Sequence, residues 1–209
     1  MTYSAKKDYQ SDETAQTYES RPMYDGVLGY LRKRVEHRVI NRFFNDLPES
    51  VKVLDCPCGN GRWFETIAQK ANHIQAVDVS VGMTEYAKNR SCSASVEVSI
   101  GDAEALELDD NSVDYVFSYA LMKHIPISIQ AKILKEFARV SRADVICSFA
   151  VFNKFSNIYW RWRKPEESYP LFQKQLEDMA SKAGLKIVRK EKISQPLIGL
   201  EYLVQFSSV

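Results

Sequence analysis

The sequence lacks an excess of either charge and any long apolar run, and both absences narrow the class of protein. Its 28 lysines and arginines nearly balance its 27 aspartates and glutamates, so net charge gives no reason to expect nucleic acid or an anionic membrane as partner. No stretch approaches the roughly 18 apolar residues that a membrane-spanning helix needs, and the polar start of the chain lacks the apolar centre of a signal peptide. We therefore expect a cytoplasmic protein.

Cysteine is scarce, with four residues in the chain, and only Cys56 and Cys58 lie close together in the sequence. Such sparse usage suits a reducing compartment, so the fold is not expected to depend on disulfides. No second pair of cysteines or histidines follows at the spacing of a zinc finger, whereas a structural zinc site needs four ligands. We therefore expect no metal site at this cysteine pair.

What the chain does contain is the composition of an ordinary globular domain. Hydrophobic residues make up 45% of its 209 residues and charged residues 26%, close to the globular average. This length accommodates one well-buried domain more readily than two. We expect a single domain over residues 1–209, in which residues 1–46 form an N-terminal helical arm or cap.

Segments typical of strands and helices alternate along the chain. Apolar residues at three- and four-residue spacing predict a first helix from Tyr24 to Asp46. Short β-branched runs then alternate with helical segments, which is the pattern of a parallel sheet covered on both faces. The predicted strands are 51–55, 73–80, 96–102, 113–121, 143–152, 185–193 and 200–208, and the predicted helices between them are 61–71, 81–90, 128–142 and 171–183. The fold class is therefore α/β, a three-layer sandwich around a mostly parallel seven-stranded sheet with an antiparallel C-terminal hairpin strand.

The turn "CPCGNG" follows the first predicted strand, and open α/β sheets bind ligands at the carboxyl ends of strands. Gly59 and Gly61 permit positive φ or close approach of the backbone to a ligand, and the helix predicted after them would point free N–H groups at it. A dinucleotide is disfavoured because Phe64 stands where the third glycine of GxGxxG allows close packing of helix and strand. The turn therefore favours a different cofactor, with zinc and a dinucleotide as the weaker alternatives.

Three motifs in order carry a family resemblance: "VLDCPCGNGRW" (53–63), "AVDVS" (76–80) and "GDAEALELDDNSVDYVFSYALMKHIP" (101–126). Over about residues 50–150 the chain resembles the class I S-adenosylmethionine-dependent methyltransferases, in the group of small-molecule and quinone-type methylases. The resemblance implies a Rossmann-like fold, S-adenosylmethionine as cofactor and S-adenosylhomocysteine as product. Pro57 departs from the usual glycine of the motif, which removes one backbone donor from the turn.

The residues that match these motifs are those expected to bind the cofactor. Asp55 ends the first strand, where its carboxylate would meet the ammonium group of the methionine part. Asp78 lies 78 − 55 = 23 residues later, near the offset of about 20 at which an acid binds ribose hydroxyls in dinucleotide folds. The resemblance assigns the ribose to Asp78 and the adenine to the residues after it. The full set from these motifs is Asp55, Cys58, Gly59, Gly61, Asp78, Val79, Met83, Asp102, Ala103 and Tyr119.

The N-terminal segment adds two residues by resemblance. In similar methyltransferases an N-terminal helix with Tyr and Arg folds over the cofactor, which would place Tyr18 and Arg21 near the cofactor's carboxylate. The alternative is a solvated surface, because a polar arm need not be ordered.

A catalytic base is optional for methyl transfer, since aligning the two reactants already supplies a large part of the rate. His124, just beyond the fourth predicted strand, is one of three histidines in the chain and is the candidate general base. A loop histidine without a catalytic role is the alternative. Tyr119 stands at the strand end itself and is the stronger candidate for a contact with cofactor or substrate.

Residues 153–170 follow the fifth strand, where substrate loops of this fold emerge, and we expect a substrate-side insertion there. The tryptophans and basic residues of "YWRWRK" suit an acidic, phosphorylated or aromatic small molecule. The sequence "SYAL" after the fourth strand lacks the Asn/Asp-Pro-Pro-Tyr/Phe of adenine amino-methylases. We expect O-, N- or C-methylation of a small molecule by a monomer or homodimer. RNA methylation and a non-catalytic S-adenosylmethionine-binding module remain the alternatives.

Overall fold

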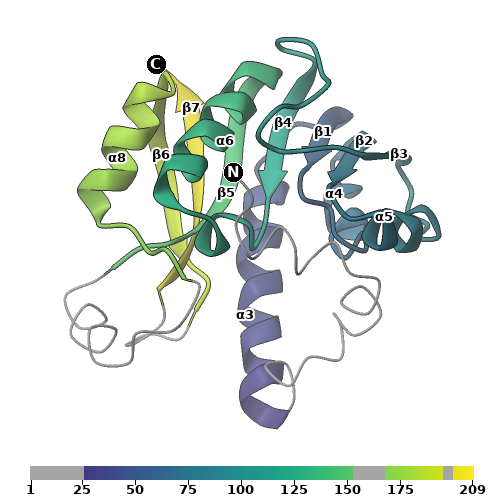
Figure 1. The fold of residues 1–209 in the computed structure, drawn as a ribbon. Coiled ribbons are helices and arrows are strands. Elements are labelled where there is room, and N and C mark those ends of the chain that lie inside the picture. Colours follow the sequence, from purple (N-terminus) through teal and green to yellow (C-terminus); the bar gives the residue numbers. More distant parts are fainter. Residues whose placement is uncertain (1–25, 153–167, 195–199) are drawn as a thin grey trace.

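The computed structural model describes residues 26–152, 168–194 and 200–209, which form one α/β unit (Figure 1). Helices and strands alternate through most of it, as the sequence predicts. The elements are α3 (Gly26–Asn45), β1 (Val51–Asp55), α4 (Phe64–Ile67), β2 (Ala71–Asp78), α5 (Val81–Lys88), β3 (Ser95–Ile100), β4 (Val113–Ser118), the 3₁₀ helix η3 (Met122–His124), α6 (Ile127–Val140), β5 (Ser141–Ala150), α8 (Gln173–Lys182), β6 (Leu185–Lys192) and β7 (Glu201–Ser208).

The seven strands form one sheet in the order β3-β2-β1-β4-β5-β7-β6. Neighbours from β3 to β5 pair in parallel, whereas β7 pairs antiparallel with both β5 and β6. The predicted mostly parallel sheet of seven strands with an antiparallel hairpin strand is therefore confirmed. The strand order reverses between β1 and β4. From β1 the chain proceeds to β2 and β3 on one side, and from β4 it proceeds to β5 on the other side.

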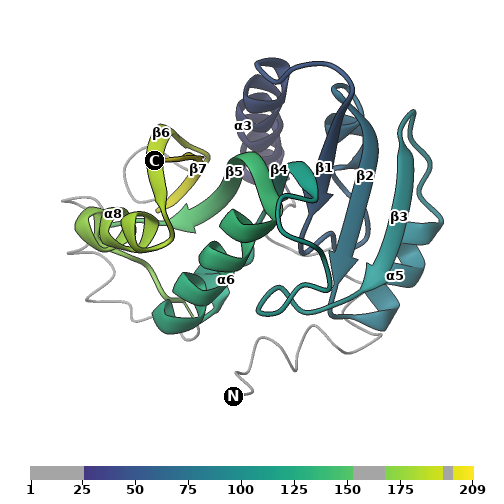
Figure 2. The same ribbon diagram turned by 90° about the horizontal axis from the view of Figure 1, so that it is seen from above.

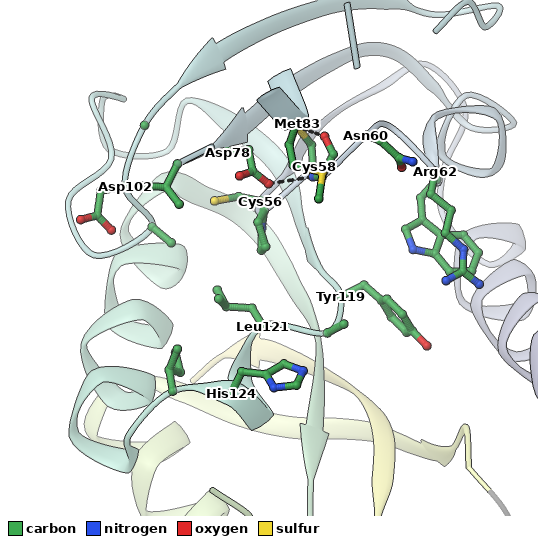
Figure 3. Close-up of a pocket in the computed structure, with 18 residues that line it drawn as sticks. Cys56, Cys58, Asn60, Arg62, Asp78, Met83, Asp102, Tyr119, Leu121 and His124 are labelled. Carbon is green, nitrogen blue, oxygen red and sulfur yellow. Dashed lines mark hydrogen bonds between the residues drawn. The ribbon is translucent and has the colours of Figure 1, made fainter. Parts of the chain in front are cut away.

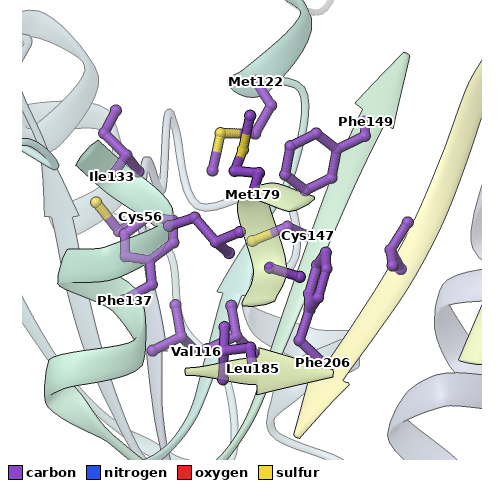
Figure 4. Close-up of a cluster of buried hydrophobic side chains, with 14 of the residues drawn as sticks. Cys56, Val116, Met122, Ile133, Phe137, Cys147, Phe149, Met179, Leu185 and Phe206 are labelled. Atoms are coloured by element: carbon purple, nitrogen blue, oxygen red, sulfur yellow. The ribbon is translucent and has the colours of Figure 1, made fainter. Parts of the chain in front are cut away.

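Helices cover both faces of the sheet and bury alternate residues of its strands (Figure 2). Leu54 of β1 and Val116 of β4 belong to the apolar cluster that contains residues of α6 and α8, part of which is drawn in Figure 4. Val53 and Phe117, one residue away on the same strands, belong to the cluster under α3, α4 and α5. Successive side chains of a strand point to opposite faces, so these two clusters confirm the predicted three-layer sandwich.

The C-terminal half of helix α3 is part of the core. It packs Val39, Ile40, Phe43 and Phe44 against the sheet, and each is less than 4% exposed. Burial of a large apolar side chain contributes about 1.5–3 kcal/mol, so these four residues tie α3 firmly to β1 and β4.

One predicted helix is much shorter than the sequence suggests. The pattern predicted a helix over residues 61–71, but α4 covers only Phe64–Ile67. The cause lies at both ends: Gly61 adopts φ of 78°, which is outside the helical region, and β2 already begins at Ala71 where it pairs with Val51. The segment between β1 and β2 is therefore mostly turn, with one short helix in it.

Parts of the predicted site lie outside the described residues. Tyr18 and Arg21 fall in residues 1–25, and the tryptophan-rich part of the insertion falls in residues 153–167. Within the described ranges, no helix is long and apolar enough to cross a membrane.

Candidate functional site

A pocket opens at the carboxyl ends of β1, β2 and β4, beside the point where the strand order reverses (Figure 3). This is the position at which open α/β sheets bind ligands. The cavity is open to solvent at its mouth. Its lining comprises Cys56, Pro57, Cys58, Gly59, Asn60, Arg62, Trp63, Asp78, Val79, Met83, Gly101, Asp102, Ala103, Tyr119, Ala120, Leu121, His124 and Ile125.

The glycine turn forms one wall of this pocket. The Cys58 N–H donates to Val77 O at 3.0 Å and the Gly61 N–H donates to Cys58 O at 3.0 Å, which ties the turn to β2. Gly59 has φ of 54° and Gly61 has φ of 78°, in the left-handed region that favours glycine. A Cβ on Gly59 would meet no atom within 4 Å, whereas one on Gly61 would lie 2.6 Å from the Phe64 ring. Gly59 therefore leaves room on the ligand side, and Gly61 permits close packing under the turn.

Asp78 is anchored at the end of β2 and is only 5% exposed. Its Oδ2 accepts a hydrogen bond from the Gly59 N–H at 2.8 Å, and its Oδ1 accepts one from the Ser80 N–H at 2.9 Å. Burial raises the pKa of this carboxyl, against the backbone N–H groups that favour its charged form. Because each carboxylate oxygen has a second lone pair, Asp78 can still accept hydrogen bonds from hydroxyl groups in the pocket.

Asp55 at the end of β1 is wholly buried, and neither of its carboxylate oxygens has a hydrogen-bond partner among the described residues. Burial, with the nearby Asp78 carboxylate, raises the pKa of Asp55 well above its ordinary value. The residue is absent from the pocket lining. An unsatisfied buried acid is costly, and a cationic ligand group beside it would relieve that cost.

Asp102 and Asp78 occupy successive positions along the pocket in Figure 3, with Asp102 at one end. The Oδ1 of Asp102 accepts from the Glu104 N–H at 3.0 Å, which holds the loop after β3. Met83 is 2% exposed, and its N–H is capped by the Ser80 hydroxyl at 3.3 Å at the start of α5. With Val79 and Ala103, these predicted residues meet around one cavity.

The opposite end of the pocket carries aromatic and cationic side chains (Figure 3). The Trp63 and Tyr119 rings pack at 5.2 Å between centroids. The Arg62 guanidinium lies 4.6 Å from the Trp63 ring and 5.9 Å from the Tyr119 ring. The sequence predicted Tyr119 here, but it did not single out Arg62, Trp63 or Asn60. Their position directly inside the "GNGRW" stretch was the signal that could have identified them.

His124 lies on the 3₁₀ helix η3 and lines the pocket across from Asp78 and Cys58 (Figure 3). The chain reaches η3 through Ala120, which has φ of 61° and donates its N–H to the Ser148 hydroxyl at 2.7 Å. Positive φ in a residue with a side chain costs about 1–2 kcal/mol, so the packing around β4 and β5 holds this sharp turn. As a result Tyr119 and His124 face one cavity.

The cysteine pair does not form a metal site in this geometry. Cys56 packs in the layer of α6 and α8, whereas Cys58 packs in the layer of α3 and α4. Burial raises the pKa of both thiols well above the ordinary value, which disfavours the thiolate form that binds metals. Within the described ranges, no three His, Cys, Asp or Glu side chains gather as a metal site.

The sequence around this site is similar to that of known methyltransferases. Residues 53–144 match the family model described as a methyltransferase domain, a span that includes all the predicted motifs. A demethylmenaquinone methyltransferase of Staphylococcus aureus (strain MRSA252) is 27% identical over 164 residues, covering 68% of this chain and 67% of the relative.

Solved structures share the fold over nearly the whole chain. Magnesium protoporphyrin IX methyltransferase from Synechocystis PCC 6803, crystallised with bound SAH, aligns with a TM-score of 0.78 at 12% identity and covers 98% of both chains. A putative methyltransferase of Haloferax volcanii, in complex with the Trm112 methyltransferase activator, aligns with a TM-score of 0.73 at 14% identity and covers 96% of this chain and 97% of its own.

Proposed function

We propose that this chain is a class I S-adenosylmethionine-dependent methyltransferase that methylates a small molecule in the pocket at the carboxyl ends of β1, β2 and β4, a proposal supported by its match to a methyltransferase-domain model and by its similarity to a demethylmenaquinone methyltransferase. Methyl transfer from S-adenosylmethionine is the activity of this enzyme class. The observation that supports the placement is the hydrogen bond from the Gly59 N–H to Asp78, which holds a glycine turn and an acid side by side in the wall of one cavity.

The cofactor fits this pocket lengthwise. The Asp102 end, with Val79, Met83 and Ala103, takes the adenine, because it combines apolar side chains with a carboxylate and backbone groups for the base edge. Asp78 takes the ribose hydroxyls through the lone pairs that Gly59 and Ser80 leave available. The open space over Gly59 admits the close approach of the sugar and sulfur chain.

Asp55 is the proposed acid for the ammonium group of the methionine part. Its two oxygens have no hydrogen-bond partner in the described part of the chain and the side chain is completely buried, so a positive charge beside it would be stabilising. A charge-assisted hydrogen bond to an ammonium would satisfy one oxygen and favour the ionised carboxylate. Side-chain or turn movement must accompany this contact, since Asp55 does not line the cavity.

The bound cofactor supplies an electrophilic methyl group on sulfur, and the side chains of this chain align the acceptor for in-line displacement. Tyr119 and His124 line the wall where an acceptor would approach. We propose that His124 receives the proton of an acceptor hydroxyl or amine, and that Tyr119 contacts the acceptor or the sulfur end of the cofactor. Trapping the acceptor beside the methyl group supplies the larger part of the rate.

The acceptor is proposed to be an aromatic or acidic small molecule. The named relatives act on a demethylmenaquinone and on magnesium protoporphyrin IX, both ring compounds. In this chain the residues from 153 to 170 carry tryptophans and arginines in sequence next to β5, and we propose that they form the outer wall of the acceptor site. We also propose that residues 1–209 act as one domain with residues 1–46 as its cap. A cytoplasmic location stays a prediction from the sequence.

The test combines binding with turnover. Calorimetric titration of the full chain with S-adenosylmethionine, S-adenosylhomocysteine and NAD should show saturable binding of the first two and none of NAD. Transfer of labelled methyl groups to a panel of phenols, quinols and aromatic acids, with total RNA as a further acceptor, then identifies the substrate class. Labelling of RNA alone, with salt-dependent RNA binding, would contradict the small-molecule proposal.

A further inference from the structure

We propose that the outer face of α3 docks on an anionic membrane surface, with the helix lying on the lipid headgroups. This docking face comprises Tyr30, Leu31, Arg34, Val35 and Arg38, all of them exposed. The inference goes beyond the proposed function, because it concerns a surface outside the pocket and a partner that is not methylated.

The spacing of the five residues places them on one side of the helix. Leu31, Arg34, Val35 and Arg38 follow one another at steps of three, one and three residues, and Tyr30 lies four residues before Arg34. Residues three and four apart are neighbours on a helix surface. The buried residues of α3 pack on the sheet from the other side, so the docking face points away from the core.

The apolar members of the docking face are large and lie on adjacent turns. Tyr30 is 58% exposed, Leu31 49% and Val35 37%. A single apolar side chain on a surface is ordinary, whereas a group of them marks a contact surface. Burial of this group against another apolar medium would be favourable, because it removes apolar area from water.

The charge of α3 is strongly one-sided. The helix holds five lysines and arginines and one acid, Glu36. That acid is completely buried and accepts hydrogen bonds from Arg32 and Arg62 on the inner side. Neither Arg34 nor Arg38 forms an ion pair with any residue that the structure describes. The outer face therefore presents positive charge, although the net charge of the whole chain is only +1.

An anionic bilayer matches both properties of this face. Basic side chains near a surface of anionic lipids are attracted to it, which suits Arg34 and Arg38. The side chains of Leu31 and Val35 would enter the boundary between headgroups and acyl chains, as in helices that lie in a membrane interface. Tyr30 has an apolar ring and a polar hydroxyl, which also suits this boundary. RNA would pair with the arginines but would leave the two aliphatic side chains in water.

The position of α3 links this face to the pocket. Figure 1 shows the N-terminal half of the helix extending past the carboxyl end of β4, the end of the sheet at which the pocket lies. On its inner side the helix borders the pocket, since the His37 ring packs 4.7 Å from the ring of Trp63. Docking through the outer face would therefore bring the pocket end of the sheet close to the bilayer, where an acceptor dissolved in lipid is concentrated.

The experiment measures sedimentation of the full chain with lipid vesicles. One set of vesicles contains equal parts of phosphatidylglycerol and phosphatidylcholine, and the other contains phosphatidylcholine alone. We expect binding to the first set at low salt, weaker binding at high salt because the charges are screened, and little binding to the second set. No cofactor is added, so a failure of the proposed methyl transfer would leave this result unchanged.

Two double variants separate the charged and the apolar contributions. Arg34→Gln with Arg38→Gln should lower the vesicle partition coefficient about tenfold or more, because two cations leave the surface. Leu31→Gln with Val35→Gln should also weaken binding several-fold, while the dependence on salt remains. All four side chains are exposed, so these changes leave the packing of α3 in place, which circular dichroism and melting curves verify.

The matched control removes two cations from another helix. Lys174→Gln with Lys182→Gln changes the net charge by the same amount, on exposed positions of α8. This helix packs in the apolar cluster on the other face of the sheet. The control should keep its vesicle affinity within about twofold of the wild-type value, since α8 faces away from the proposed contact.

Three results would overturn the inference. The first is a folded wild-type protein that does not bind the phosphatidylglycerol vesicles at low salt. The second is an equal loss of vesicle binding in the α3 arginine variant and in the α8 control, which would show a response to net charge alone. The third is salt-dependent binding of RNA without binding to vesicles, which would assign the docking face to a nucleic acid.

Discussion

The Asp78 carboxylate accepts a hydrogen bond from the backbone N–H of Gly59 at 2.8 Å, which joins the end of β2 to the turn after β1. The same carboxylate caps the chain at Ser80, just before α5. One acid therefore organises the glycine turn and the start of the next helix. The proposed contact with ribose would therefore add a binding role to a carboxylate that already has a structural role.

Replacing Asp78 by Asn should affect both binding and stability. Sequence reasoning alone assigns Asp78 to the ribose and predicts a binding defect with an intact fold. The structure adds the loss of one charged acceptor for two backbone N–H groups, so the melting temperature should fall as well. We expect S-adenosylhomocysteine affinity to drop by about 1–3 kcal/mol, measured by calorimetry beside thermal melts.

The matched control for this variant is Asp114→Asn. Asp114 also accepts from a backbone N–H, that of Lys52 at 2.8 Å, but it lies at the amino ends of the strands. It should lose stability and keep its affinity. Equal affinity loss in both variants would mean that Asp78 acts only through the fold.

The two glycines of the turn should respond differently to alanine. A Cβ on Gly61 would lie 2.6 Å from the Phe64 ring, so Gly61→Ala combines a clash with an unfavourable φ. We expect it to destabilise the fold by about 2 kcal/mol or more. Gly59→Ala has space for its Cβ and should cost about 1 kcal/mol, but the methyl group would occupy ligand space. Urea unfolding and calorimetry together should separate these effects, and equal affinity loss in the two variants would contradict the assignment of Gly59 to the ligand side.

Asp55 should make the folded state less stable as the pH rises, whereas an acid paired with a cation makes it more stable. Burial and the Asp78 charge raise its pKa in the folded chain, so the folded state binds the proton more tightly than the unfolded state does. Stability is therefore greatest below the unfolded-chain value of 3.8 and is lost as the pH rises through the higher folded-state pKa. Asn cannot ionise. The difference in melting temperature, Asp55→Asn minus wild type, should become more positive from pH 5 toward pH 8.

The same variant should bind S-adenosylhomocysteine about tenfold or more weakly, since the ammonium loses a charged partner. Adding S-adenosylhomocysteine should therefore raise the melting temperature of the wild-type protein more than that of the variant. A difference in melting temperature that does not change with pH would contradict the assignment of a raised pKa to Asp55.

The fold followed from the sequence because its strong signals are local and periodic. The β-branched runs and the amphipathic pattern of α6 each lie within one element, and seven strands appeared where the pattern placed them. The helix over 61–71 was wrong because Gly61 and the early start of β2 compete with helical propensity. Such competition is tertiary in origin and leaves little trace in the pattern of apolar residues.

The site was predictable where a residue belongs to a motif and not where it depends on distant pairing. Asp78, Met83 and Asp102 were identified from their positions after strands. The burial of Glu36 was not, because it accepts hydrogen bonds from Arg32 on its own helix and from Arg62, 26 residues away. In the sequence Glu36 looks like one more charge on a surface helix, and only the packing of α3 against the sheet shows it to be buried.

His124 provides the test of chemistry as distinct from binding. Its place on η3, facing the cavity with Tyr119, allows contact with an acceptor but not with the adenine end of the pocket. If it removes a proton, His124→Gln should slow turnover by about 10²- to 10⁴-fold and leave S-adenosylhomocysteine affinity within twofold.

The control for that variant is His73→Gln, a histidine of β2 whose ring lies near Glu97 of β3 and away from the pocket. It should retain turnover. A His124→Gln enzyme with wild-type turnover would show that alignment beside the methyl donor is sufficient for the reaction, since an acceptor that loses its proton to water needs no protein base. His124 would then belong to the wall of the pocket, and Tyr119 would be the remaining polar side chain at the strand end to examine.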